Sequence, residues 1–150
     1  MLLKRSRAKK TMEAEAKMYG QNADSYKANA VTTMTPNELM FTLFDELVKR
    51  LMRAELALGK KDFALFEASV QRSIEIIDYL GATLDMQYPI STELLRLYEY
   101  FTYELGRSKI GHRMEQFRHV KAMIVDLRDT FRQAEKNVNE GNPGTLTANG

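Results

Sequence analysis

Apolar residues recur at spacings of three and four along four successive stretches of the chain. The first stretch follows Thr35-Pro36-Asn37-Glu38, which is a strong helix start. Threonine at the N-cap and glutamate three positions later can satisfy free backbone amides, and proline suits the first helical position. Gly59 is the predicted end of this helix. Its apolar stripe comprises Leu39, Leu43, Phe44, Leu47, Leu51, Ala54 and Leu58.

Two further helices are predicted in the middle of the chain. Asp62 can cap the second, whose pattern runs on until Tyr88-Pro89, and Ser91 can cap the third, which Gly106 or Gly111 closes. The apolar stripe of the second helix comprises Phe63, Phe66, Val70, Ile77, Gly81 and Leu84. That of the third comprises Leu94, Tyr98, Phe101 and Leu105.

The fourth stretch has the most regular period. Its apolar positions alternate gaps of three and four, which is the pattern of a heptad seam. They are Phe117, Val120, Ile124, Leu127, Phe131, Ala134 and Val138. Four amphipathic helices joined by short turns can bury their stripes only against each other. The sequence therefore predicts an all-α fold, an antiparallel up-down four-helix bundle with an N-terminal cap segment.

Outside the four stretches the chain is polar. Residues 18–34 contain Tyr26 and Val31 as isolated apolar anchors and are interpreted as a tethered cap on the bundle. Residues 1–17 are predicted to be a basic, disordered extension and residues 141–150 a disordered tail, which leaves residues 18–140 as one domain.

Composition and charge exclude several classes of protein. The chain of 150 residues has no cysteine, so it forms no disulfide and no cysteine-ligated metal site. No apolar run approaches the roughly 20 residues needed to cross a bilayer, so no membrane insertion is expected. Residues 1–17 carry a net charge of +4 and the whole chain +2, which leaves residues 18–150 faintly acidic at −2. A nucleic-acid-binding surface is expected to be basic, so no nucleic-acid partner is predicted.

Residues with catalytic chemistry are scarce. A di-metal bundle needs Glu-x-x-His pairs, and the chain has none, since Glu115 and His119 are four positions apart. Two alternatives remain open. One is a histidine phosphotransfer bundle in which His119 accepts a phosphoryl group and Lys121 steadies it. The other is a signalling or scaffold bundle that binds a different client. We expect a protein that is not an enzyme and that uses no cofactor or metal.

The chain has more apolar surface than one stripe per helix requires. Because successive helical residues turn by about 100°, Leu65, Ile76 and Leu80 are expected to lie to one side of the second stripe. Contacts with two neighbouring helices account for most of this surplus. The remainder suits a groove for a partner's amphipathic helix. Further surplus residues are Met40, Phe41, Val48, Met52, Leu95, Leu97 and Tyr100.

An ordered set of short motifs resembles the flagellar secretion chaperone family called FliS. The set covers about residues 18–136 with spacing similar to that family. It comprises Tyr26-x-x-x-Ala30-Val31, Thr35-Pro36-x-Glu38-Leu39, Leu43-Phe44-Asp45, Ile76-Ile77-Asp78-x-Leu80, Leu84-Asp85, Leu97-Tyr98-x-Tyr100 and Leu127-Arg128-Asp129-Thr130-Phe131. Met18-Tyr19-Gly20 is similar to the start of the family, so residues 1–17 are either a genuine extension or the product of an upstream start.

The resemblance implies a function and a site. Members of the family are cytosolic chaperones that bind the disordered C-terminal segment of flagellin, prevent premature polymerisation and deliver it to the flagellar type III export gate. The client is expected to dock on a groove beneath an N-terminal lid, with Ile76 far enough from the core to tolerate a charge. The predicted groove and lid residues are Tyr26, Val31, Ile76, Leu80, Leu84, Leu95 and Tyr98. The chain itself is expected to be a monomer or a weak homodimer.

Overall fold

The computed structural model of the protein describes residues 33–140. The predicted extension at residues 1–17, the predicted tail at residues 141–150, and the lid anchors Tyr26 and Val31 lie outside the described residues. Within the described range, none of the helices combines the length and apolar character that a membrane span requires.

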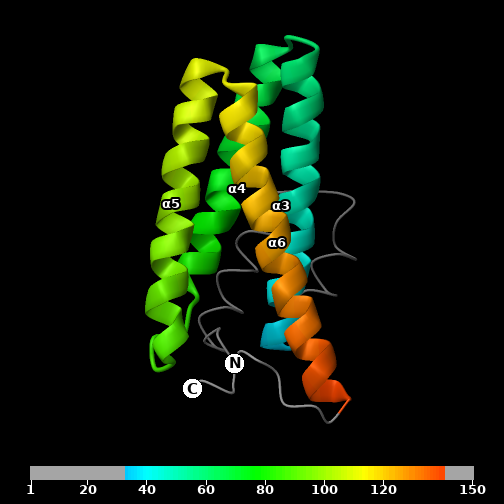
Figure 1. The fold of residues 1–150 in the computed structure, drawn as a ribbon, viewed down its shortest axis with the longest axis vertical. Coiled ribbons are helices and arrows are strands. Elements are labelled where there is room, and N and C mark those ends of the chain that lie inside the picture. Colours follow the sequence, from blue (N-terminus) through cyan, green and yellow to red (C-terminus); the bar gives the residue numbers. More distant parts are fainter. Residues whose placement is uncertain (1–32, 141–150) are drawn as a thin grey trace.

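Four helices make up most of the described residues and run alternately up and down (Figure 1). They are α3 (Pro36–Gly59), α4 (Phe63–Ala82), α5 (Pro89–Gly111) and α6 (Met114–Asn139). Both α3 and α5 pack on α4 and on α6, so the four helices close into a ring around one core. The predicted all-α four-helix bundle is confirmed.

The two ends of the bundle differ in how the chain closes them. The upper end in Figure 1 holds the α3–α4 and α5–α6 turns, and we call it the two-turn end. The lower end holds the α4–α5 turn, the first residues of α3 and the last residues of α6, and we call it the one-turn end. An up-down bundle of four helices always has this asymmetry, because three turns must be shared between two ends.

The predicted starts of the first two helices are confirmed. The Thr35 side chain accepts a hydrogen bond from the Glu38 backbone N–H at 3.1 Å, and Pro36 occupies the first helical position. Asp62 accepts from the Leu65 backbone N–H at 3.2 Å at the start of α4. Each cap satisfies a backbone amide that has no partner inside the helix.

The turn between α4 and α5 differs from the prediction at both of its ends. α4 stops at Ala82, where the Thr83 hydroxyl lies 3.0 Å from the Tyr79 carbonyl and 3.2 Å from the Leu80 carbonyl. Beyond it, the Asp85 carboxylate accepts from the Gln87 backbone N–H at 3.0 Å in a local turn. α5 starts at Pro89, whose ring suits the first helical position. Ser91 does not cap the helix, and its hydroxyl donates to the Asp85 carbonyl at 2.6 Å instead.

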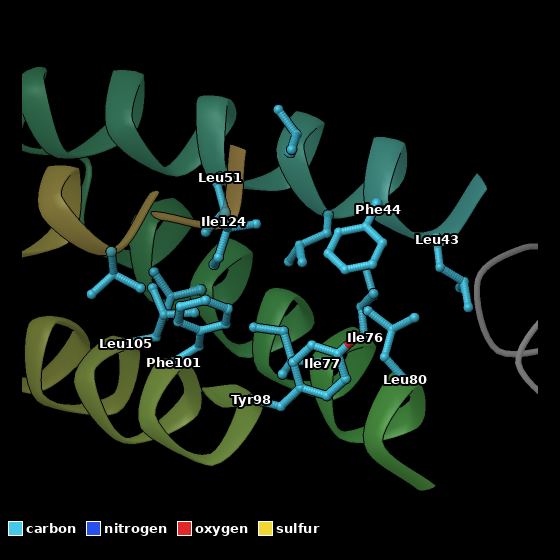
Figure 2. Packing of buried hydrophobic residues seen from close by; sticks show 14 of the residues in the cluster. Leu43, Phe44, Leu51, Ile76, Ile77, Leu80, Tyr98, Phe101, Leu105 and Ile124 are labelled. Atoms are coloured by element: carbon cyan, nitrogen blue, oxygen red, sulfur yellow. The ribbon is translucent and has the colours of Figure 1, made fainter. Parts of the chain in front are cut away.

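An aromatic group stands at each end of the core. At the two-turn end, Phe66 and Phe117 meet edge to face with ring centroids 5.6 Å apart. At the one-turn end, the Phe44 ring lies 6.5 Å from Tyr98 and 5.8 Å from Phe131. All five rings are at most 4% exposed. The space between them is filled by other buried side chains, among them Leu51, Ile77, Phe101, Leu105 and Ile124 (Figure 2).

The heptad seam of α6 is buried over its first part but not at its end. Phe117, Val120 and Ile124 are fully buried, whereas Val138 is 52% exposed. Leu127 and Ala134 are only partly buried. Glu135 accepts a hydrogen bond from Asn37 in the first turn of α3 at 3.2 Å, so Val138 lies about one turn beyond the start of that neighbouring helix. The expectation that the seam is buried throughout is therefore wrong at Val138.

Candidate functional site

Two of the predicted groove residues, Ile76 and Leu80, lie in the half of α4 that leads to the one-turn end. Each is 1% exposed. Figure 2 shows their side chains directed toward α3, near Leu43 and Phe44. The expectation that Ile76 tolerates a charge is therefore wrong for this structure. The position of Ile76 on its helix did not reveal how closely the surrounding side chains enclose it. Leu84, just after α4, is also buried, at 3% exposed.

The predicted groove residues of α5 lie at a different contact. A Cβ atom added to Gly81 of α4 would be 3.2 Å from Leu95 Cδ1 and 3.7 Å from Tyr98 Cδ2. Leu95 and Tyr98 therefore pack closely on the backbone of α4 at its glycine. Tyr98 is 3% exposed, whereas Leu95 is partly exposed.

The structure thus divides the predicted groove between two helix contacts. Ile76 and Leu80 belong to the contact of α4 with α3, and Leu95 and Tyr98 belong to the contact of α4 with α5. Tyr98 links the two, because its ring also reaches Phe44 of α3. Both contacts lie in the half of the bundle that leads to the one-turn end.

Burial also fixes the chemical state of this region. Removal from water raises the pKa of the Tyr98 hydroxyl far above its usual value, so the side chain stays neutral at any physiological pH. The described site residues are therefore apolar or aromatic and carry no charge, and all except Leu95 are buried. Such a cluster can bind another apolar surface where it is exposed, and it supplies neither a general base nor a nucleophile.

An open depression near the one-turn end was not predicted from the sequence. The guanidinium of Arg132 lies 5.0 Å from the ring centroid of Phe41, so α6 and α3 meet there through a cation–π contact. Phe41 was recognised as surplus apolar surface, but its partner on α6 could not be found without knowing how the helices align. The residues that line the depression are Phe41, Arg132, Glu135, Lys136, Asn139 and Glu140.

Ion pairs tie α3 to α6 along their outer edge. Near the one-turn end, Asp45 pairs with Arg128 and Arg132. Nearer the two-turn end, Glu55 accepts from Lys121 Nζ at 2.6 Å and from Arg118 Nε at 2.9 Å. The Lys121 hydrogen bond is the largest cause that holds the pKa of Glu55 below its usual range, with Arg118 adding to it against partial burial.

These pairs also bear on the phosphotransfer alternative. His119 is exposed on α6, as that alternative requires. Lys121, which was expected to steady a phosphate, is engaged by Glu55 instead. Across residues 33–140, no group of three or more His, Cys, Asp or Glu side chains is arranged to hold a metal ion.

Fold and site together define a class, that of helical-bundle proteins whose candidate site is a neutral apolar cluster, buried except at Leu95. The family model described as "Flagellar protein FliS" matches residues 18–138 of this chain. The chain belongs to the FliS family. This is a family of chaperones and not of enzymes, so the protein is not an enzyme.

Two relatives extend over most of the chain. The flagellar secretion chaperone FliS of Bacillus subtilis (strain 168) is 26% identical over 110 residues, which cover 73% of this chain and 83% of the relative. The flagellar secretion chaperone FliS of Salmonella typhimurium is 28% identical over 108 residues, which cover 70% of this chain and 80% of the relative. The resemblance noted in the sequence motifs is confirmed.

Proposed function

We propose that the protein is a cytosolic flagellar export chaperone. In this proposal it binds the disordered C-terminal segment of flagellin, prevents premature polymerisation and delivers the subunit to the flagellar type III export apparatus. The observation that carries the proposal is the match of the family over residues 18–138, together with relatives named as flagellar secretion chaperones. A disordered client that folds onto a preformed bundle can cover a large area, while the free energy of ordering keeps the complex reversible.

The client docks, we propose, in the half of the bundle that leads to the one-turn end. Ile76, Leu80, Leu84, Leu95 and Tyr98 cluster in this half and are all buried except Leu95. Only one turn closes that end, so a covering segment can leave and a client helix can enter without unfolding a turn. An amphipathic client helix would place its apolar side chains against Leu95 first, and against the buried residues once the contacts of α4 with α3 and α5 open, as helices do in apolar grooves.

The segment before α3 acts as the lid in this proposal. Tyr26 and Val31 are its apolar anchors, and residues 1–17 and 141–150 take no part in binding. Replacing Tyr26 with alanine should raise client affinity if the lid only competes with the client. The same change should lower affinity if Tyr26 also contacts the client. Unchanged affinity in a calorimetric titration would contradict the lid.

The first experiment tests the client itself. Flagellin from the host should be retained by the immobilised chaperone, and flagellin that lacks its C-terminal segment should not. A synthetic peptide of that segment should bind in calorimetry and gain helical circular dichroism. Equal retention of intact and truncated flagellin would overturn the proposed client segment.

The second experiment tests the docking face at the residue that can be changed without unfolding the bundle. Leu95 is partly exposed, so Leu95→Asp should leave the far-ultraviolet spectrum intact. Loss of an apolar anchor of this kind should weaken client binding by a factor of about ten or more. Leu65→Asp is the matched control, because Leu65 is 50% exposed and lies near the opposite end of the bundle. Equal affinities of the two variants would move the docking face away from Leu95.

A further inference from the structure

α5 carries two seams with the same spacing. The inner seam packs in the core and consists of Leu94, Tyr98, Phe101, Leu105 and Ser108, with gaps of four, three, four and three. The outer seam repeats these gaps two residues later along the chain. It consists of Arg96, Tyr100, Tyr103, Arg107 and Ile110. Two residues correspond to about 200° around a helix, so the outer seam lies nearly opposite the core.

The bundle makes little use of the outer seam. Tyr100 is 40% exposed, Tyr103 64% and Ile110 82%, and both arginines are exposed. α5 packs on α4 and on α6, and its opposite side faces away from the bundle (Figure 1). Tyrosine and arginine are the residues enriched at the energetic centres of protein interfaces. An exposed seam of this composition is therefore a candidate protein interface.

Contacts within the chain hold the centre of the outer seam in place. The Arg107 guanidinium lies 5.8 Å from the centroid of the Tyr103 ring. Arg107 also pairs with Glu104 at 3.4 Å, and Glu104 is 8% exposed and accepts a hydrogen bond from Gln116 of α6. This network restricts Tyr103 and Arg107 before any partner arrives, which lowers the entropy lost on binding.

We propose that the outer seam of α5 binds the same seam of a second copy of the chain, with the two helices antiparallel and a two-fold axis beside Tyr103. The argument is charge complementarity. In this arrangement residues equally far before and after Tyr103 face each other across the axis. Glu99, four before, meets Arg107 of the other copy, four after. A two-fold axis forms this pair twice.

The remaining positions fit the same register. Arg96 faces Ile110, so the aliphatic part of the arginine can cover the most exposed apolar side chain of the helix. Tyr100 faces Gly106, where the absent side chain leaves room for the ring. A Cβ atom at Gly106 would meet nothing within 4 Å inside its own chain, so the bundle itself does not require that glycine.

This pairing lies away from the part of the proposed client site where α4 contacts α3. α3 and α5 stand diagonally across the bundle, because each packs on α4 and on α6. The outward face of α5 therefore points away from α3 and from Ile76 and Leu80, which are directed toward it. A pair formed through α5 therefore leaves the contact of α4 with α3 uncovered. A single helix pair is a small interface, so the association is weak.

Sedimentation velocity on the full chain tests the pairing, from about 5 to about 500 µM, a range that brackets weak association. The wild type should show a reversible monomer–dimer equilibrium. Glu99→Arg and Arg107→Glu should each weaken the dimer about tenfold or more, because each places two like charges across the axis twice. The double variant Glu99→Arg/Arg107→Glu exchanges the charges and should restore the dimer.

The matched control is Arg53→Glu, the same charge change at an exposed position of α3. It should leave the dimer unchanged, and circular dichroism checks that every variant folds. A wild type that stays monomeric at the highest concentration would overturn the proposal. So would a dimer that ignores both single exchanges, or single exchanges that weaken it without rescue in the double variant.

Discussion

The two ends of the bundle cover their cores by different means. At the two-turn end, the turn residues themselves form the cover. His112, between α5 and α6, stacks on Phe63 with ring centroids 4.1 Å apart and also meets the edge of Phe66. Its Nε2 atom lies 2.8 Å from a carboxylate oxygen of Glu67 on α4. This cover cannot leave without breaking the contacts of a turn.

At the one-turn end, a single connection links helices of the bundle. The group of Phe44, Tyr98 and Phe131 lies toward this end, and Ile76 is nearby on α4. These side chains are as deeply buried as those at the other end. The comparison teaches that two core groups can be equally buried although two turns close one end of the bundle and only one turn closes the other. Because only one turn closes this end, our proposal places client binding there.

The largest expected effect compares one phenylalanine from each end. Phe117→Ala and Phe131→Ala should each lower the free energy of unfolding by about 3–5 kcal/mol, because each leaves a cavity in the core. Phe131→Ala should fall near the lower value, since the one-turn end can relax further into its cavity. Urea unfolding followed by circular dichroism measures both. Lys136→Ala, an exposed change on the same helix, should have an effect below about 0.5 kcal/mol. Equally small effects from Phe131→Ala and Lys136→Ala would contradict the assigned orientation of α6.

A charge buried on the α4 side of the one-turn end should have the next largest effect. Ile76→Asp should lower the free energy of unfolding by at least about 3 kcal/mol, because Ile76 is 1% exposed and its surroundings are apolar. Ala68→Asp is the control, since Ala68 is exposed on the same helix. If the free energy of unfolding of Ile76→Asp equals that of the wild type, this face opens readily in the absence of a client.

Breaking the cover at the two-turn end should have a smaller effect. His112→Ala should lower the free energy of unfolding by about 1–2 kcal/mol. It removes the stack on Phe63 and places alanine at a φ of 51°, which is unfavourable for a residue with a Cβ atom. Asparagine tolerates this backbone conformation better, so His112→Asn separates the two causes. If both variants unfold like the wild type, the stack does not hold the turn.

Most of the fold follows from the sequence, and the reasons are local. Thr35 and Asp62 cap helices through neighbours three residues away, so short patterns suffice to find them. Val138 shows where periodicity stops being informative. Its spacing continues the seam, but its burial depends on where α3 begins, and that neighbour lies about a hundred residues away.

The site was less predictable for a related reason. Ile76 and Leu80 were predicted to lie beside the core stripe, but the structure buries both, because a stripe does not reveal which neighbouring side chains fill the space around it. Arg132 was missed because its contact with Phe41 joins residues far apart in the chain. The Leu95 contact with Gly81 likewise depends on how two helices align. Such contacts can be predicted only when the alignment of the helices is known, and the periodicity of a single helix does not give that alignment.

Two carboxylates extend the comparison of the ends to pH, and Glu55 represents the two-turn end. Its lowered pKa means that the folded state prefers the charged form, chiefly through the hydrogen bond from Lys121. The stabilisation is present above the pKa of the unfolded chain and is lost as the pH falls through the folded-state pKa. Glu55→Gln should therefore lower the free energy of unfolding by about 0.5–1 kcal/mol at pH 7. The difference from the wild type should vanish in acid, and a difference that persists at low pH would rule out an ionic cause.

Asp78, on α4 toward the one-turn end, should behave in the opposite way. Partial burial, followed by the charge of Glu75, raises its pKa, so the folded state disfavours the charged form. The resulting destabilisation is absent below the pKa of the unfolded chain and appears as the pH rises through the raised folded-state pKa. Asp78→Asn should therefore stabilise the protein at pH 7, by only a few tenths of a kcal/mol because the residue is exposed.

Asp126→Asn, at an exposed position of α6, is the control and should be neutral. Unfolding of both variants from about pH 3 to 8 measures the effect, since the gain from Asp78→Asn should disappear at the acid limit. A gain that is independent of pH would mean that the asparagine side chain stabilises the helix by itself, and the electrostatic contrast between the two ends would then be absent.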